Sequence, residues 1–175
     1  METSNVTSLN SNRETALART AHFQAVQEAC LNEAQIAAMK TAANLRGKTY
    51  IGGSTDPEQG KAAAGVGVLF HKDIAAYEVT NPIEDYLNAV KRGRCKIVCF
   101  DAGGVTVACG TIYGWAGARK GSTEAARTDD LIAIVQAQFD TMEPGPNIIM
   151  GDLSFFLQRW PSSMKRVDGH RKRQP

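Results

Sequence analysis

The spacing of apolar residues along the chain predicts two amphipathic helices. Between Glu33 and Leu45 apolar residues recur at intervals of three and four, and Gly47 follows where a helix C-cap glycine is expected. A second segment of the same period begins after Ser122 or Thr123, either of which can cap a helix through its hydroxyl. The capping box Ser11-x-x-Glu14 predicts a further, short helix near the N-terminus.

Short apolar runs bounded by turn residues predict the strands. They cover Asn5–Leu9, His22–Gln27, Thr49–Gly52, Val66–Phe70, Ala75–Thr80, Cys95–Phe100, Val105–Tyr113 and Asn147–Met150. Two of these runs flank the turn segment Asp101-Ala102-Gly103-Gly104, which is a hairpin signal and excludes a purely parallel sheet. We therefore expect an α/β (α+β) fold in which helices and strands are mixed.

Length and composition fit one globular domain. The chain has 175 residues, of which 43% are hydrophobic and 22% are charged, and a chain of this size can bury its own core. We find no apolar run long enough to span a membrane and no basic and apolar leader of a signal peptide. Four cysteines without Cys-x-x-Cys spacing disfavour a zinc site and favour a reducing compartment, so we expect an intracellular protein of cytoplasm or nucleus.

Charge divides the chain near Ser154. Residues 1–154 carry 14 basic and 17 acidic residues, a net charge of −3, whereas residues 155–175 carry six basic residues and one acidic residue, a net charge of +5. We expect residues 1–154 to form the domain and residues 155–175 to form a disordered basic tail. Such a tail is either a phosphate-binding arm or a solvated chain end.

Two carboxylates that follow predicted buried strands are the first candidates for chemistry. Glu28 follows His22–Gln27, and Asp152 follows the strand that ends at Met150. A carboxylate at the end of a buried strand is costly unless it meets a cation or a hydrogen-bond donor. If the two strands lie side by side, the pair can hold Mg²⁺, which prefers oxygen ligands. Taken singly, each carboxylate is an ordinary strand-end residue.

Five segments, in this order, resemble motifs of the endonuclease/exonuclease/phosphatase superfamily, whose fold is that of deoxyribonuclease I. They are Asn5-Val6-Thr7-Ser8-Leu9, Ala25-Val26-Gln27-Glu28, Ala64-Gly65-Val66-Gly67-Val68-Leu69, Thr111-Ile112-Tyr113 and Ile148-Ile149-Met150-Gly151-Asp152-Leu153-Ser154. The resemblance covers residues 1–154. It implies a two-sheet β-sandwich flanked by helices, represented by its N-terminal part.

The resemblance also implies a role for each matching residue. Glu28 would be a ligand of Mg²⁺ or Mn²⁺, with Asn5 beside it to fix the metal or the phosphate. Tyr113 would hydrogen-bond the scissile phosphate, and Asp152 would orient or deprotonate the attacking water. Ser154 stands where the family has asparagine and would offer the phosphate a shorter hydroxyl donor. For Asn5 and Tyr113, ordinary strand-edge and packing roles are equally open.

The second half of the family's fold, with a further aspartate and an Asp-His pair, has no counterpart in the resemblance. Because only 21 residues follow Ser154, we expect a fold that stops after the Gly-Asp-x-Ser strand and leaves one apolar sheet face uncovered. An uncovered face favours self-association. Without the missing histidine, we expect hydrolysis by this chain alone to be slow or absent.

The implied activity is metal-dependent hydrolysis of a phosphoester, with a nucleic-acid phosphodiester as the first choice of substrate. Four basic residues before and within the predicted hairpin could contact phosphates, although a charged loop is usually solvated. They are Lys91, Arg92, Arg94 and Lys96. Two alternatives stay open: a non-catalytic remnant that binds metal or phosphate, and a truncated mobile-element fragment without a function of its own.

Overall fold

The strands form two four-stranded sheets. The computed structural model describes residues 1–5, 9–53, 55, 64–115, 118–119, 121–143 and 145–151, and the side chains of residues 2–5 are left aside. The first sheet has the order β1-β2-β4-β3, in which β1 is parallel to β2 and the other pairs are antiparallel. Its strands are β1 (Glu2–Asn5), β2 (Phe23–Gln27), β3 (Lys48–Gly52) and β4 (Gly67–His71).

The second sheet has the order β5-β6-β7-β8 and contains the predicted hairpin. Strands β6 and β7 are antiparallel around the turn at residues 102–105, whereas β8 runs parallel to β7. Its strands are β5 (Ala76–Glu78), β6 (Cys95–Asp101), β7 (Thr106–Ile112) and β8 (Asn147–Gly151). The mixed sheets confirm that the fold is α/β and that neither sheet is purely parallel.

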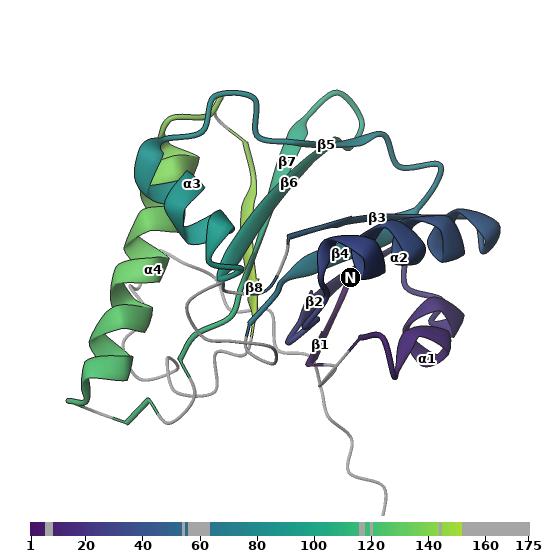
Figure 1. Cartoon of the computed structure of the whole chain (residues 1–175). Coiled ribbons are helices and arrows are strands. Elements are labelled where there is room, and N and C mark those ends of the chain that lie inside the picture. The colour runs from purple at the N-terminus through teal and green to yellow at the C-terminus, as the bar shows by residue number, and fades with distance from the viewer. Residues whose placement is uncertain are drawn as a thin grey trace, which may run out of the picture.

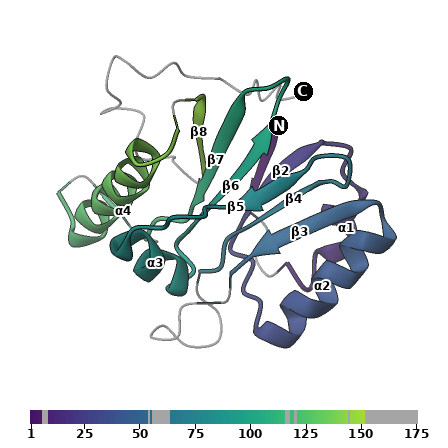
Figure 2. The same cartoon turned by 90° about the horizontal axis from the view of Figure 1, so that it is seen from above.

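Four described helices lie on the outer faces of the two sheets, so the sandwich has four layers (Figure 1). Helices α1 (Arg13–Ala18) and α2 (Glu33–Leu45) cover the first sheet. Helices α3 (Glu84–Lys91) and α4 (Thr123–Asp140) cover the second sheet. Seen from above, the helix pairs stand on opposite sides of the packed sheets (Figure 2).

Alternation along the strands separates three apolar cores, because successive side chains point to opposite faces of a sheet. In β2, Val26 points to α1 and α2, whereas Phe23 points between the sheets. In β7, Ile112 points to α3 and α4, whereas Cys109 points between the sheets. The core between the sheets is made of the buried residues Phe23, Val68, Phe70, Val98 and Cys109.

This packing corrects the expectation of an uncovered sheet. In β8, Ile149 packs against the core under α3 and α4, and Ile148 and Met150 pack between the sheets. Both faces of β7 and β8 are therefore in contact with other layers in the described part of the chain. The predicted uncovered face is not found there, so the structure does not support self-association through such a face.

Local structure agrees with the sequence where a periodic pattern and a cap occur together. Helix α2 has the predicted bounds, and Gly47 adopts the left-handed φ of 68° that a C-cap glycine makes accessible. Ser122 caps α4 by accepting a hydrogen bond from the backbone N–H of Ala125. No described helix is both long and apolar enough to cross a membrane.

Two local predictions were wrong, and one helix was not predicted. Helix α1 begins after Asn12 without a side-chain cap, and Glu14 of the expected capping box instead pairs with Arg46 at 2.6 Å. The first strand ends at Asn5 rather than beginning there, and Leu9 lies in a turn; residues 6–8 lie outside the described residues. Helix α3 was not expected at all.

Candidate functional site

A buried hydrogen bond holds β2 against β7 across the two sheets. The side-chain amide of Gln27 donates to the hydroxyl of Thr111 at 3.0 Å. Both side chains are fully buried, with exposed fractions of 1% and 0%. Gln27 is the last residue of β2, and Thr111 is the next-to-last residue of β7. The two strand ends therefore meet, and the residues that follow them are brought together.

Those residues are Glu28 and Tyr113, two of the predicted site residues. The Tyr113 hydroxyl donates to Oε1 of Glu28 at 2.6 Å, although 85 residues separate the two in the sequence. Both side chains are half-buried. Burial, and next the hydrogen bond to Glu28, raise the pKa of Tyr113 well above its usual value of 10.0. The phenol therefore stays protonated and remains a donor near neutral pH.

The backbone that carries Glu28 is strained in a way that the surrounding structure supports. Glu28 and Cys30 have φ values of 54° and 49°, in the left-handed region that non-glycine residues rarely occupy. The backbone N–H groups of Ala29 and Cys30 donate to the carbonyls of Gly65 and Ala64, at 2.9 and 3.2 Å. Such strain persists only where neighbouring contacts fix it, and it is concentrated at functional sites.

Backbone hydrogen bonds connect the Glu28 loop to the second sheet through Gly65. Gly65 has a φ of 90°, and a Cβ on it would lie 2.9 Å from the backbone nitrogen of Cys30. Its N–H donates to the Gly93 carbonyl at 3.0 Å, and the N–H of Tyr113 donates to the Arg94 carbonyl at 2.8 Å. Only glycine fits this close approach, so position 65 links the Glu28 loop to the Tyr113 loop.

The guanidinium of Arg94 lies against the aromatic rings of Tyr113 and Trp115. Its guanidinium carbon is 5.4 Å from the Tyr113 ring centroid and 4.5 Å from that of Trp115. One guanidinium nitrogen donates to the Gly114 carbonyl at 3.1 Å. The residue is only 2% exposed. The structure thus brings three predicted residues together, namely Glu28, Tyr113 and Arg94, and it buries the third.

The other basic residues of the predicted phosphate-binding group lie in different surroundings. Lys91 is the last residue of α3, and both it and Arg92 are exposed. Lys96 is buried in β6 and forms an ion pair with Glu78 of β5. The four basic residues therefore do not form one surface: two are exposed beside the helix end, and two are buried at the start of β6.

Asn5, Asp152 and Ser154 are placed only as far as the chain is described. Asn5 ends β1 and is the register partner of Gln27, so its backbone lies beside the residue that precedes Glu28. Its side chain is not described. Gly151 ends β8 and is the register partner of Ile112. Asp152, which follows Gly151 in the sequence, and Ser154 lie outside the described residues.

The carboxylate of Glu28 is a ligand of the kind that divalent metal ions such as Mg²⁺ prefer. The described residues contain no group of three or more histidine, cysteine, aspartate or glutamate side chains that could hold a metal. Glu28 supplies carboxylate oxygen at the end of β2, and Mg²⁺ is commonly held by one or two carboxylates together with water and substrate phosphate. Among the described side chains, Glu28 could therefore supply one carboxylate ligand to a metal ion at this position.

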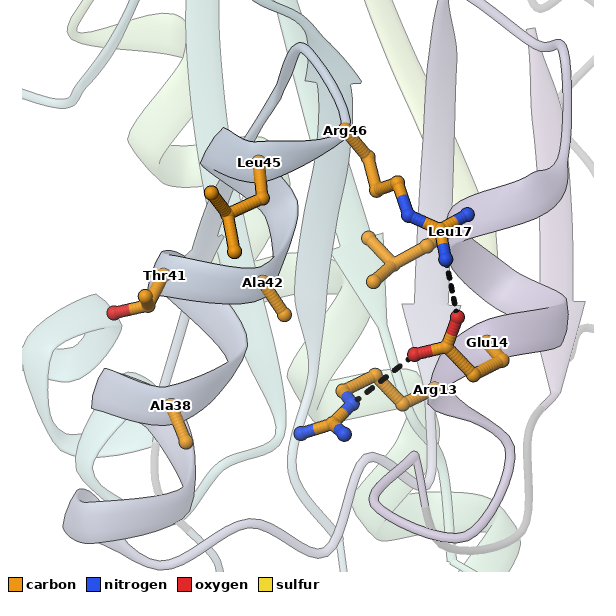
Figure 3. A pocket seen from close by; sticks show the side chains of 8 residues that line it. All are labelled: Arg13, Glu14, Leu17, Ala38, Thr41, Ala42, Leu45 and Arg46. Atoms are coloured by element: carbon orange, nitrogen blue, oxygen red, sulfur yellow. Dashed lines mark hydrogen bonds and ion pairs between the residues drawn. The ribbon is translucent and has the colours of Figure 1, made fainter.

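A groove of about 450 Å³ lies elsewhere, between α1 and α2 on the outer face of the first sheet. The aliphatic side chains of Leu17 and Leu45 line it, and Glu14 bridges Arg13 and Arg46 at its edge (Figure 3). None of the predicted site residues lines this groove.

Sequence reasoning missed Gln27, Thr111 and Trp115 as parts of the site. Gln27 and Thr111 stand in segments quoted for the family resemblance, but neither received a role of its own. Their signal is a polar residue at an inward-facing position of an otherwise apolar strand. For Trp115 the signal is only its place two residues after Tyr113.

No protein-family model and no curated protein matches the sequence. Solved structures do match the fold. The chain is similar to the 3′ phosphatase NExo from Neisseria bound to a product DNA hairpin, with 18% identity and a TM-score of 0.60, over 85% of this chain and 55% of that one. It is similar to an AP endonuclease from Archaeoglobus fulgidus, with 13% identity and a TM-score of 0.57, over 87% of this chain and 55% of that one.

A third similar structure is a mannosyl-6-phosphatase from Bacteroides thetaiotaomicron, with 15% identity and a TM-score of 0.51, over 86% of this chain and 63% of that one. The chain thus spans between about half and two thirds of the length of these proteins. The three are named for two phosphatases and an endonuclease, so one fold carries different phosphoester substrates.

Proposed function

The described part of the chain has the deoxyribonuclease I-like fold of the endonuclease/exonuclease/phosphatase superfamily, and on this premise we propose that the protein is a metal-dependent hydrolase of nucleic-acid phosphodiesters. The observation that carries the proposal is the hydrogen bond from Tyr113 to Glu28. It places a carboxylate and a phenol from different sheets at one point, just beyond the strand ends.

Glu28 holds Mg²⁺ or Mn²⁺ in this proposal, with Asn5 beside it. A bound divalent ion neutralises charge on phosphoryl oxygens during in-line attack. The contribution of the chain is to fix the carboxylate: the strained backbone at Glu28 and the donated bond from Tyr113 restrict its direction. A carboxylate fixed before substrate arrives loses less conformational freedom on binding.

Tyr113 contacts the scissile phosphate. Its hydroxyl can donate one hydrogen bond, and in the structure it donates this bond to Glu28 at 2.6 Å. A phosphate oxygen of bound substrate competes for that hydrogen bond, because it is also an anionic acceptor. The raised pKa of Tyr113 keeps the proton available for either acceptor.

Asp152 and Ser154 complete the proposal from the sequence beyond β8. Asp152 accepts a proton from the attacking water and orients it, and the Ser154 hydroxyl donates to a phosphate oxygen. The support is positional: β8 is parallel to β7, and its last residue, Gly151, is the register partner of Ile112, the residue before Tyr113.

Nucleic acid is the proposed substrate because of charge. Lys91 and Arg92 are exposed, and residues 155–175 carry a net charge of +5. Basic groups of this kind bind phosphate backbones without regard to sequence. Arg94 and Lys96 are too buried to take that role, so the proposed phosphate contacts outside the reacting centre are Lys91, Arg92 and the basic tail.

Nicking of supercoiled DNA by the purified full chain tests the proposal. Because the family's Asp-His pair has no counterpart here, we expect only slow nicking, which requires Mg²⁺ or Mn²⁺ and stops with a chelator. Asp152→Ala and Glu28→Gln should each lower this slow rate by about 100-fold or more. The matched control is Glu33→Gln, which makes the same change at an exposed residue of α2. Absence of nicking, or nicking that survives in Asp152→Ala, would overturn the proposal; DNA binding without cleavage would favour a non-catalytic binding protein.

A further inference from the structure

Arg94 is a buried cation beside Tyr113, the tyrosine of the Glu28–Tyr113 pair. Its guanidinium lies against the rings of Tyr113 and Trp115, at 5.4 and 4.5 Å from their centroids. Guanidinium groups interact favourably with aromatic faces at these distances. The positive charge of Arg94 is therefore buried against the rings of Tyr113 and Trp115.

Backbone contacts fix where Arg94 stands. Its N–H donates to the Ala89 carbonyl of α3 at 3.0 Å, and its carbonyl accepts from the N–H of Tyr113 at 2.8 Å. Its side chain donates to the Gly114 carbonyl at 3.1 Å. Main chain and side chain of one residue thus contact two consecutive residues of the segment that leaves β7.

Burial excludes direct contact between Arg94 and a substrate phosphate. The residue is 2% exposed, and burying a cation costs free energy unless rings, carbonyls or charges compensate. In this protein the ring faces and the Gly114 carbonyl give part of that compensation. Such an arrangement serves orientation, because the planar guanidinium stacks on rings as a lysine ammonium cannot.

We propose that Arg94 is a positioning residue that holds Tyr113 and Trp115 at the end of β7 and thereby sets the direction of the Tyr113 hydroxyl toward Glu28. The catalytic consequence rests on the proposed function, but the structural one does not. Arg94 thus acts through Tyr113 and touches neither substrate nor metal.

Fluorine NMR on protein labelled with 3-fluorotyrosine tests the structural part without any activity. The chain has four tyrosines, Tyr50, Tyr77, Tyr86 and Tyr113, and Tyr113→Phe assigns the fourth signal by its loss. We expect Arg94→Met to shift and broaden the Tyr113 signal while the Tyr50 and Tyr77 signals stay in place. Arg94→Lys keeps the positive charge and is less disruptive to the fold than Arg94→Met. It should give the same broadening, because a lysine ammonium cannot stack on the rings of Tyr113 and Trp115.

A sharp Tyr113 signal in Arg94→Lys, at its wild-type position, would overturn the proposal. So would equal shifts of all four signals, which indicate that Arg94 only stabilises the fold. The exposed variant Arg46→Met is the matched control for removing a guanidinium, and we expect it to move none of the four signals.

Hydrolysis rates supply the second arm through a double-mutant cycle. We expect Arg94→Lys to lower kcat about 2- to 30-fold, the range of a cation–π contact, with KM changed less than twofold. In the Tyr113→Phe background the same substitution should change kcat less than twofold, because the positioned hydroxyl is already gone. Additive losses in the cycle would overturn the positioning role. If wild type shows no hydrolysis, the proposed function fails while the fluorine spectra still decide on Arg94.

Discussion

The hydrogen bond between Gln27 and Thr111 should contribute measurably to stability, and Thr111→Val tests this. Valine has nearly the shape of threonine but cannot accept a hydrogen bond. The side-chain N–H of Gln27 that now donates to Thr111 at 3.0 Å would lose this acceptor. Because the two side chains are 1% and 0% exposed, water cannot replace the lost hydroxyl without entering the core between the sheets.

The magnitude follows from that burial. An ordinary hydrogen bond contributes about 1 kcal/mol, but a buried donor that loses its acceptor costs about 1–3 kcal/mol. Valine leaves almost no cavity, so no packing term is added. For a domain of this size each kcal/mol lowers Tm by about 2–4 °C. We therefore expect Thr111→Val to lower the free energy of unfolding by about 1–3 kcal/mol.

Urea unfolding followed by circular dichroism measures the effect, and the midpoint should fall while the m-value stays constant. The matched control is Thr49→Val in β3, which makes the same change at a half-buried strand position outside the contact between β2 and β7. We expect it to cost less than about 0.5 kcal/mol. Equal losses in the two variants, or no loss in Thr111→Val, would refute the idea that this bond holds the two sheets together.

Three further predictions concern the site, the first sheet and pH. Tyr113→Phe should lower kcat by about 10- to 100-fold, since a hydrogen bond to a carboxylate contributes about 1.5–3 kcal/mol, and an unchanged kcat would separate Tyr113 from catalysis. Gly67→Ala should cost about 1–3 kcal/mol in urea unfolding, because the new Cβ would lie 2.5 Å from the buried Tyr50 hydroxyl, whereas Gly53→Ala, with its nearest atom at 3.6 Å, should be mild. Burial raises the pKa of the Cys95 and Cys109 thiols from 9.0 to about 12; the native state then holds more protons than the unfolded state between pH 9 and 12, so stability should fall as pH rises through this window. Cys109→Ala should flatten that decline, and an unchanged slope would contradict it.

Much of the fold could be predicted where periodicity and punctuation agree. Helix α2 begins and ends at the predicted residues because its apolar stripe and Gly47 give independent signals. Helix α3 was not predicted, because only Tyr86 and Ala89 of its eight residues are buried and its N-cap, Ile83, has no capping side chain. A short polar helix of this kind is stabilised by packing on the sheet rather than by a local pattern.

The site could be predicted in its members but not in its geometry. Glu28 and Tyr113 were identified as candidates, yet nothing in the sequence states that β2 faces β7, which is decided by the packing of two sheets. The burial of Arg94 and Lys96 was equally invisible, because a run of basic residues looks like a solvated loop. In the structure Arg94 lies against the ring of Trp115, and the buried Lys96 forms an ion pair with the exposed Glu78.

Binding of Mn²⁺ by wild type and Glu28→Gln is the most direct test of the claim that the meeting of β2 and β7 builds a metal-dependent site. Water-proton relaxation reports the bound ion without requiring substrate or turnover, and Glu33→Gln controls for loss of one negative charge. We predict weak binding by wild type and by Glu33→Gln, since such a site relies on substrate phosphate to complete the metal shell, and at least about tenfold weaker binding by Glu28→Gln. Identical titrations of wild type and Glu28→Gln would remove Glu28 from the metal site and contradict the account.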